Sequence, residues 1–340
     1  MGIIKKTYCA ALLSFCALTS KAQDPNFSQF FASPLTMNPA MTGKFAGQFR
    51  IAGNYRNQWP TINQAYTTAT ASFDAGILKD RIPEFDQFGI GFMGFTDRSG
   101  NGVLQYNYLS FSTAYHKALD ENGDNQLGIG FQGTYSSKRL DVSSLNFEDM
   151  LESDGFTGVT KETFDGTKLD MSYFDLNTGI LYNGTTNGDN NIYAGISMYH
   201  VNQPKETFNR GDFKLARRLT IQAGGHVPVG DGEDAFHFSA NHSRQAGATN
   251  TMVGGAYGKL MNPEQPVPTI LYLGSWYRLK DAIIPYVGLE FGEFHFGASY
   301  DVNVSKLKPA SNMRGGIEIS LIYIKQPRDP NAKKLNCPKF

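Results

Sequence analysis

The sequence has 340 residues and no net formal charge, so no overall basic field marks it as a nucleic-acid-binding protein. It contains 36 Gly, 25 Phe and 17 Tyr but only 18% charged residues, a composition typical of strands and tight turns. After residue 22 no apolar run reaches the roughly 18 residues that a membrane helix needs, so any membrane span must be a β-strand. The length suits one large barrel or two soluble domains.

Residues 1–22 have the pattern of a secretory signal peptide. Lys5 and Lys6 form a positive start, residues 8–18 form an apolar stretch, and a small-x-small site ends at Ala22. We therefore predict cleavage after Ala22 and a mature chain that enters the secretory route.

Cysteine usage bears on the same question. Cys16 offers an alternative processing site of the lipoprotein type, but bulky Phe15 before it fits that processing poorly. Cleavage after Ala22 would leave Cys337 as the single cysteine of the mature chain, so no internal disulfide is expected. Cys337 lies in the predicted periplasmic tail, residues 326–340. Whether it is an inert thiol or an intermolecular tether stays open.

Residues 23–45 precede the first alternating stretch and combine prolines with large apolar side chains. The prolines break regular structure, whereas Phe27, Phe30 and Phe31 are too apolar for a free tail. We predict that this segment buries itself inside a barrel as a plug. Packing along a strand edge is the alternative.

Fourteen stretches of the chain have the length and alternation of tilted outer-membrane strands. The alternation is clearest from Gln126 to Tyr135, and it is also strict over residues 313–323, where Ile317 and Ile319 oppose Glu318. So many amphipathic strands must close on themselves. We therefore predict an all-β fold, a transmembrane antiparallel β-barrel over residues 46–325 in which the last strand meets the first. The stretches are 47–57, 64–75, 86–96, 103–116, 125–137, 172–183, 191–200, 214–227, 235–243, 248–259, 269–278, 282–291, 294–302 and 313–324.

Connection lengths predict which end of the barrel faces outside. The connections 120–125, 183–191 and 230–234 are rich in Asn, Asp and Gly, as short periplasmic hairpins are. Longer connections, above all 138–171 and 201–213, fall at the opposite end and are expected to be extracellular.

Aromatic residues near the predicted strand ends indicate interfacial girdles. The alternative is the ordinary aromatic content of a β-rich chain. The girdle residues would be Trp59, Trp276, Tyr277, Tyr286 and Tyr323.

The connection 138–171 mixes apolar side chains, such as Leu151, Phe156 and Phe164, with many acidic residues. A loop of this kind is expected either to fold over the barrel mouth or to contact a protein. We favour a docking or lid role over a merely structural loop.

Strand phase places charged and amide side chains on the inner face of the barrel. They are Arg50, Asn54 and Arg56 on the first strand and Glu290, Asp301 and Glu318 on the last three. Closure would bring basic and acidic groups together at the seam. Two interpretations remain open. The groups form an ion-pair network that stabilises closure, or they hold the 23–45 segment or a segment inserted by a partner. His226 and His295 are also placed inward, as polar lining.

Motifs of catalysis are absent. The chain has no H-E-x-x-H, no G-x-S-x-G and no phosphate-binding loop, and its six His have no ligand spacing. The turn 120–124 resembles a calcium loop only superficially, because its Gly is misplaced. We expect no enzymatic activity, no metal and no cofactor.

Both ends of the mature chain resemble the PorP/SprF family of Bacteroidetes outer-membrane proteins. The stretches that carry the resemblance are QDPNFSQFFASPLTMNPAMTG, FRIAGNYRNQWP, YDVNVSKL, GGIEISLIY and the final Cys-Pro-Lys-Phe. The resemblance implies an outer-membrane barrel linked to type IX secretion and gliding motility. It further implies non-enzymatic support for the export or surface anchoring of large adhesins through their C-terminal domains. The implied partners are such an adhesin, secretion components and outer-membrane lipid.

Two other functions are considered. A plugged transporter of hydrophobic small molecules would need an apolar lumen, and the inward Arg, Glu, Asp and Gln residues argue against it. A soluble periplasmic β-protein would need a second layer over its apolar faces, and the chain shows no helices to supply one.

Overall fold

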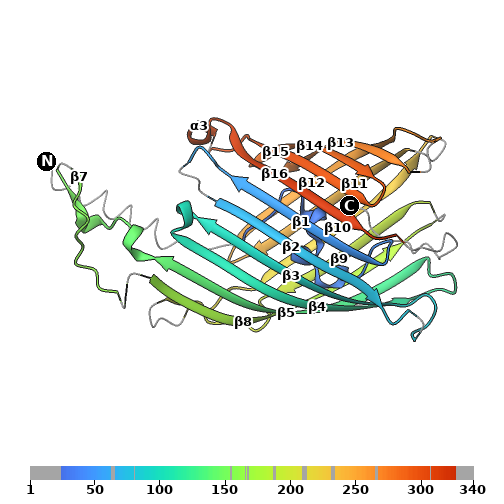
Figure 1. Cartoon of the computed structure of the whole chain (residues 1–340), viewed down its shortest axis with the longest axis horizontal. Coiled ribbons are helices and arrows are strands. Elements are labelled where there is room, and N and C mark those ends of the chain that lie inside the picture. The colour runs from blue at the N-terminus through green and yellow to red at the C-terminus, as the bar shows by residue number, and fades with distance from the viewer. Residues whose placement is uncertain are drawn as a thin grey trace.

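The computed structural model shows fourteen antiparallel strands in one closed barrel (Figure 1). It describes residues 24–326, apart from 63–65, 80, 154, 165, 167, 187–188, 209–212, 231–233, 265–266 and 307. The predicted signal peptide and Cys337 therefore lie outside the described residues. Each strand pairs with its neighbours along the chain, and β1 pairs with β16 to close the barrel.

The strands of the barrel follow chain order, interrupted only by a small two-stranded sheet, β6–β7, between β5 and β8. The barrel strands are β1 (Phe49–Gln58), β2 (Tyr66–Ile77), β3 (Gln87–Ser99), β4 (Leu104–Ala118), β5 (Asn125–Asp141), β8 (Lys168–Gly184), β9 (Asn191–Tyr199), β10 (Arg218–Val229), β11 (Asp234–Gln245), β12 (Ala248–Leu260), β13 (Thr269–Arg278), β14 (Ala282–Phe291), β15 (Phe294–Asn303) and β16 (Arg314–Ile324). The small sheet consists of β6 (Leu151–Glu152) and β7 (Gly155–Phe156).

In the part of the chain that the structure describes, the helices are few and short. They are η1 (Phe30–Ala32), α2 (Pro34–Met37), η2 (Pro39–Met41), η3 (Gly100–Gly102), η4 (Val142–Ser144), η5 (Glu148–Met150) and α3 (Lys308–Ser311). Within the described part of the chain, no helix is long and apolar enough to cross a membrane.

The predicted antiparallel barrel is confirmed, with differences at the strand ends. β5 and β8 extend further than expected because their ladder continues to the pair Asp141 and Lys168. The connection between them is therefore 142–167 rather than 138–171. Backbone hydrogen bonds between the two strands continue beyond the alternating stretches 125–137 and 172–183, on which the prediction relied. Conversely, β10 begins at Arg218, four residues later than predicted.

Side chains alternate between the two faces of the barrel wall as expected. On β16, Ile317 and Ile319 are exposed, whereas Glu318 and Ser320, which alternate with them, are buried. The same division recurs around the barrel, with apolar side chains outside and polar ones inside. This arrangement inverts that of a water-soluble protein and suits a wall surrounded by lipid.

The girdle prediction was wrong for two residues. Trp276 and Tyr286 are only 1% and 4% exposed and point into the lumen, whereas Tyr277 faces outward. Successive residues of a strand point to opposite faces, so Trp276 and Tyr277 cannot both face lipid. Nearness to a strand end was the basis of the prediction, and it does not determine the face.

The two ends of the barrel differ in their connections. The longest ones, 142–167 and 200–217, lie at the same end, which we call the loop end. At the opposite turn end, β14 and β15 are joined by Gly292 and Glu293 alone. In outer-membrane barrels the longer loops face the outside of the cell.

Candidate functional site

The N-terminal segment, residues 24–45, runs through the barrel from the loop end to the turn end. At one end the backbone N–H of Asp24 donates to Gln245, the last residue of β11, at 2.8 Å. At the other end the ammonium of Lys44 bonds to Gln126, near the start of β5. The segment is buried along almost its whole length. The lumen is therefore occupied by the protein's own chain.

Three short helices, η1, α2 and η2, allow the segment to turn repeatedly within this space. Pro34 and Pro39 start α2 and η2, where a residue without an N–H is tolerated. The Asn38 side chain accepts the N–H of Ala40 at 2.8 Å and so caps η2. Its amide also donates to the carbonyl of Ile180 on β8 at 3.1 Å, which ties the cap to the barrel wall.

Glycines in the wall make room for the segment. A Cβ on Gly130 of β5 would lie 2.3 Å from the backbone nitrogen of Ala40. A Cβ on Gly89 of β3 would lie 2.3 Å from the carbonyl oxygen of Thr42. Backbone atoms on both sides cannot yield to such a contact. The wall and the segment are thus shaped to each other at these positions.

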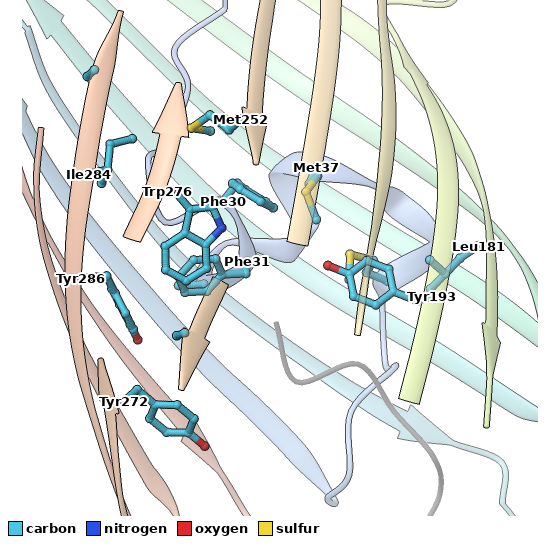
Figure 2. Close-up of a cluster of buried hydrophobic side chains, with 14 of the residues drawn as sticks. Phe30, Phe31, Met37, Leu181, Tyr193, Met252, Tyr272, Trp276, Ile284 and Tyr286 are labelled. Atoms are coloured by element: carbon cyan, nitrogen blue, oxygen red, sulfur yellow. The ribbon is translucent and has the colours of Figure 1, made fainter. Parts of the chain in front are cut away.

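Aromatic packing holds the middle of the segment against β13 and β14. The ring of Phe31 lies 4.9 Å from that of Trp276 and 5.5 Å from that of Tyr286, measured between centroids (Figure 2). Phe30 packs edge-on against Phe31 at 5.7 Å. The Trp276 indole N–H donates to the hydroxyl of Ser239 at 3.0 Å. Such contacts contribute both buried area and a fixed geometry.

Phe27 belongs to a second apolar cluster, nearer the loop end. It is 3% exposed and packs with Phe95, Tyr106, Tyr173 and Leu215. The structure therefore places all three predicted plug aromatics, Phe27, Phe30 and Phe31, inside the lumen.

A buried charge network joins the barrel seam to the segment. Arg56 on β1 lies opposite Glu318 on β16, with Nη1 3.2 Å from Oε2, and its Nη2 is 2.7 Å from Oδ2 of Asp301 on β15. The Glu318 carboxylate also accepts the backbone N–H groups of Ser28 and Gln29, at 2.7 and 2.9 Å. Seam closure and retention of the segment, which the sequence left as alternatives, thus involve the same side chains.

Arg50 and Asn54 have other partners. Arg50 does not reach the seam network but pairs with Asp74 on β2 at 2.8 Å. Asp74 also accepts the N–H of Gly43 at 2.8 Å, so this pair holds the segment as well. The Asn54 amide, in the orientation that satisfies its neighbours, donates to the carbonyl of Ala32 at 3.0 Å.

Glu290 lies apart from the network. Its carboxylate accepts the hydroxyl of Tyr272 at 2.7 Å, and His295 Nδ1 is 3.9 Å away. In the register of β14 to β16, Glu290 is level with His295 and Ile322, so it lies nearer the turn end than Glu318 does. Strand phase identified its face but not its height in the barrel. His226, the other inward histidine of the sequence analysis, stacks on His237 at 5.5 Å.

A second charged cluster, which we call the Asp24 clamp, holds the start of the segment at the loop end. It consists of Asp24, Asp175, His200, Arg218 and Gln245. His200 bridges two carboxylates, with Nε2 2.8 Å from Asp24 and Nδ1 2.8 Å from Asp175. Arg218 Nη1 lies 3.4 Å from the Asp24 carboxylate, and Gln245 donates to it at 3.2 Å.

The clamp shifts the titration of two of its members. Burial alone would lower the pKa of His200, but the carboxylates of Asp24 and Asp175 outweigh burial and raise that pKa to about 9. Burial would raise the pKa of Asp24, but His200 and Arg218 hold it well below its usual range. At neutral pH His200 is therefore a cation that lies between the carboxyl groups of Asp24 and Asp175.

The sequence analysis missed the Asp24 clamp and Asp74. Asp74 and Asp175 lie at inward positions of predicted strands, so strand phase contained a signal for both. Asp24 lies in a segment without periodicity. His200 is the last residue of the predicted strand 191–200, and alternation would place it on the outer face with Ile196. β9 instead ends at Tyr199, and His200, with a φ of 58°, turns inward. Their meeting depends on how the segment threads the barrel.

The lumen arrangement retains the N-terminal segment. Its charged groups bond to one another and to backbone amides. Among the described residues, no group of three or more His, Cys, Asp or Glu side chains is arranged to hold a metal ion.

A closed barrel with an apolar outer surface and a polar lumen defines an outer-membrane protein, here with the lumen occupied by its own N-terminal segment. The family model for the type IX secretion system membrane protein PorP/SprF matches residues 19–323, and the chain belongs to that family. The resemblance noted from the sequence is thereby confirmed. A comparison with curated proteins found no match.

Solved barrels show distant likeness. The Pseudomonas putida toluene transporter TodX has a TM-score of 0.49 at 9% identity, over 90% of this chain and 94% of that one. The Ralstonia pickettii toluene transporter TbuX has 0.45 at 14% identity, over 87% and 93%. BamA from Haemophilus ducreyi lacking POTRA domains 1–3 has 0.41 at 9% identity, over 82% and 70%. Values this low say nothing about what this chain binds or moves.

Proposed function

We propose that this barrel is a non-enzymatic docking component of the type IX secretion system. It supports export or surface anchoring of a large adhesin by holding the adhesin's C-terminal domain at the loop end. The filled lumen carries the proposal. Residues 24–45 bond to opposite walls, for example to Glu318 at Ser28 and to Ser197 at Met37. A barrel filled in this way offers a partner its loops rather than a passage.

The position of the loops supports this function. In outer-membrane barrels the loop end faces the cell surface, where an exported adhesin would be held. Because β1 pairs with β16, the barrel wall has no free strand edge for a partner to extend. We therefore expect a partner to recognise the connections of the loop end, above all 142–167 and 200–217.

Transport of hydrophobic small molecules, the alternative, requires an apolar route through the lumen. The apolar side chains of the inner wall, such as Trp276 and Tyr286, form one cluster against the segment, and amide and charged side chains that bond to the segment lie around it. Gln132, for example, donates to the carbonyl of Leu35 at 3.2 Å, and Tyr199 donates to the same carbonyl at 2.9 Å. Displacing the segment would uncover this cluster but also leave these polar groups without partners, which disfavours an apolar solute.

The test is affinity purification of the tagged barrel from native outer membranes, followed by mass spectrometry. An unrelated outer-membrane barrel with the same tag serves as the control. Specific enrichment of a large exported adhesin, with or without secretion components, would support the docking function. A barrel that is recovered alone and carries fatty acid or another hydrophobic molecule would favour the transporter.

A further inference from the structure

The connection 142–167 projects beyond the loop end of the barrel, along its long axis (Figure 1). β5 and β8 carry it clear of the membrane. On their outer faces Arg139 and Asp170 form an ion pair, Nε to Oδ1 2.6 Å, with side chains 53% and 54% exposed. A charged pair this exposed on the outer face of a barrel belongs in water rather than in hydrocarbon. The connection beyond it is therefore outside the bilayer.

The connection has a small structure of its own. Phe147 stacks on Phe164 at 5.4 Å between ring centroids, and Met150 is buried at 6% exposure. The Asp149 carboxylate accepts the hydroxyl of Thr160 at 2.9 Å and also accepts the N–H of Lys161. These contacts join the two arms of the connection, so its tip is presented in a defined arrangement.

The tip presents apolar side chains to water. Leu151 and Phe156 face each other directly across β6–β7, and directly opposed residues of a strand pair lie on the same face. They are 58% and 55% exposed, and Val159, three residues after Phe156 in the chain, is 75% exposed. We call Leu151, Phe156 and Val159 the hairpin patch. Grouped apolar exposure outside the bilayer is typical of a binding surface.

The stretch of sequence that carries the hairpin patch is strongly negative. Residues 141–168 contain seven acidic and two basic residues, a net charge of −5. Glu148, three residues before Leu151, and Glu152, directly after it, are both exposed. Elements that attach to anionic membrane surfaces carry Lys and Arg beside their apolar side chains, and this hairpin has the opposite sign. Its complement is a positively charged surface.

We propose that the hairpin patch docks a partner protein that presents an apolar surface bordered by Lys and Arg. The inference rests on the docking function proposed above and names the surface and the chemistry by which the partner is held. Leu151 and Phe156 supply the apolar contact, and the acidic residues select the partner by charge.

The test is photo-crosslinking in intact cells, with a photoreactive phenylalanine analogue in place of Phe156. The matched control places the analogue at Phe213, a 57%-exposed aromatic of the other long connection. We expect a protein adduct at Phe156 that is absent at Phe213, and mass spectrometry of the adduct should place the crosslink in a segment with net positive charge. Adducts confined to lipid, or to acidic or neutral protein segments, would overturn the proposal.

A charge variant tests the recognition step. Glu148→Lys combined with Glu152→Lys should lower the Phe156 adduct about tenfold, because two attractive contacts become repulsive. Glu121→Lys, at an exposed position of the turn end, should leave the adduct unchanged. An adduct insensitive to the reversal at Glu148 and Glu152 would contradict recognition by charge.

The identity of the adduct separates the two proposals. A basic segment of an adhesin would support both. A basic segment of another protein would support the hairpin patch and count against the adhesin. If the adhesin co-purifies with the barrel but no protein adduct forms at Phe156, the docking function stands and the hairpin patch is not its surface.

Discussion

Arg56 and Glu318 face each other across the two strands that close the barrel, with Nη1 of the arginine 3.2 Å from Oε2 of the glutamate. Both side chains are nearly inaccessible to solvent. The same carboxylate receives two backbone amides from the N-terminal segment. Barrel closure and lumen filling are therefore coupled, and a change at this carboxylate should affect both.

Glu318→Ala should lower the free energy of unfolding by roughly 3 to 5 kcal/mol. The substitution removes the carboxylate that pairs with buried Arg56 and accepts the backbone N–H groups of Ser28 and Gln29. The measurement is denaturant unfolding in lipid vesicles, followed by heat-modifiable gel migration. Glu290→Ala is the matched control. Its carboxylate is less buried and accepts one hydroxyl, so its loss should cost about 1 kcal/mol. Equal costs for the two variants would contradict the special role of Glu318.

Double variants test which arginine shares the network. Arg56→Ala and Glu318→Ala should cost less together than the sum of their single effects, because they remove the same contact. Arg50→Ala and Glu318→Ala should be nearly additive, because Arg50 pairs with Asp74. Additivity in both cases, in the same unfolding assay, would rule out coupling across the seam.

Gly130→Ala should displace the segment from the wall, since the new Cβ would meet the backbone nitrogen of Ala40 at 2.3 Å. We expect higher single-channel conductance in planar bilayers and faster proteolysis of residues 24–45. Gly94→Ala is the control, because its Cβ meets only Leu109 at an ordinary 3.6 Å. Unchanged conductance and protection in Gly130→Ala would show that the segment tolerates the intrusion.

Phe31→Ala should remove the ring between Trp276 and Tyr286 and leave a cavity, at a cost of roughly 3 to 5 kcal/mol. Trp276 should then emit at longer wavelength, because water can enter beside it. Trp59→Phe in the background leaves Trp276 as the single tryptophan to be read. An unshifted emission maximum would mean that Phe31 does not shield the indole.

The Asp24 clamp should make stability depend on pH. The pKa of His200 is raised to about 9 in the folded protein, whereas in the unfolded chain it is near 6.5. Protonated His200 therefore contributes fully to the free energy of unfolding below pH 6.5, and this contribution is lost as the pH rises through 9. That contribution is on the order of 3 kcal/mol. The groups that face His200 are Asp24, Asp175 and, through Asp24, Arg218.

The measurement compares wild type with His200→Gln by thermal unfolding between pH 5 and pH 10. Wild type should be more stable at pH 6, and the difference should shrink as pH approaches 10. The lowered pKa of Asp24 has the opposite pH dependence. Ionised Asp24 contributes to the free energy of unfolding above its unfolded pKa, and this contribution is lost only in strong acid. A constant difference across this range would show that His200 does not carry the charge assigned to it.

Local pattern accounts for how much of the fold could be predicted. The two-residue alternation of strands needs no tertiary information, so the strands, their faces and the inward set from Arg50 to Glu318 followed from the sequence. Motifs at both ends likewise identified the family. The ends of β5 and β8 did not follow from the apolar pattern, because the hydrogen bonds between these two strands continue beyond it to Asp141 and Lys168.

What the tertiary structure decided is which inward groups meet. The heights of Glu290 and Glu318 along the barrel depend on the register of whole strands, and so Arg56 rather than Arg50 reaches Glu318. Alternation along β13 turns Trp276 inward, and the tertiary structure decided that Phe31 packs on it. Asp24 meets His200 only because the N-terminal segment, which has no periodicity of its own, threads the closed barrel. Periodicity reports the face of a residue, whereas its partners depend on contacts between segments far apart in the chain.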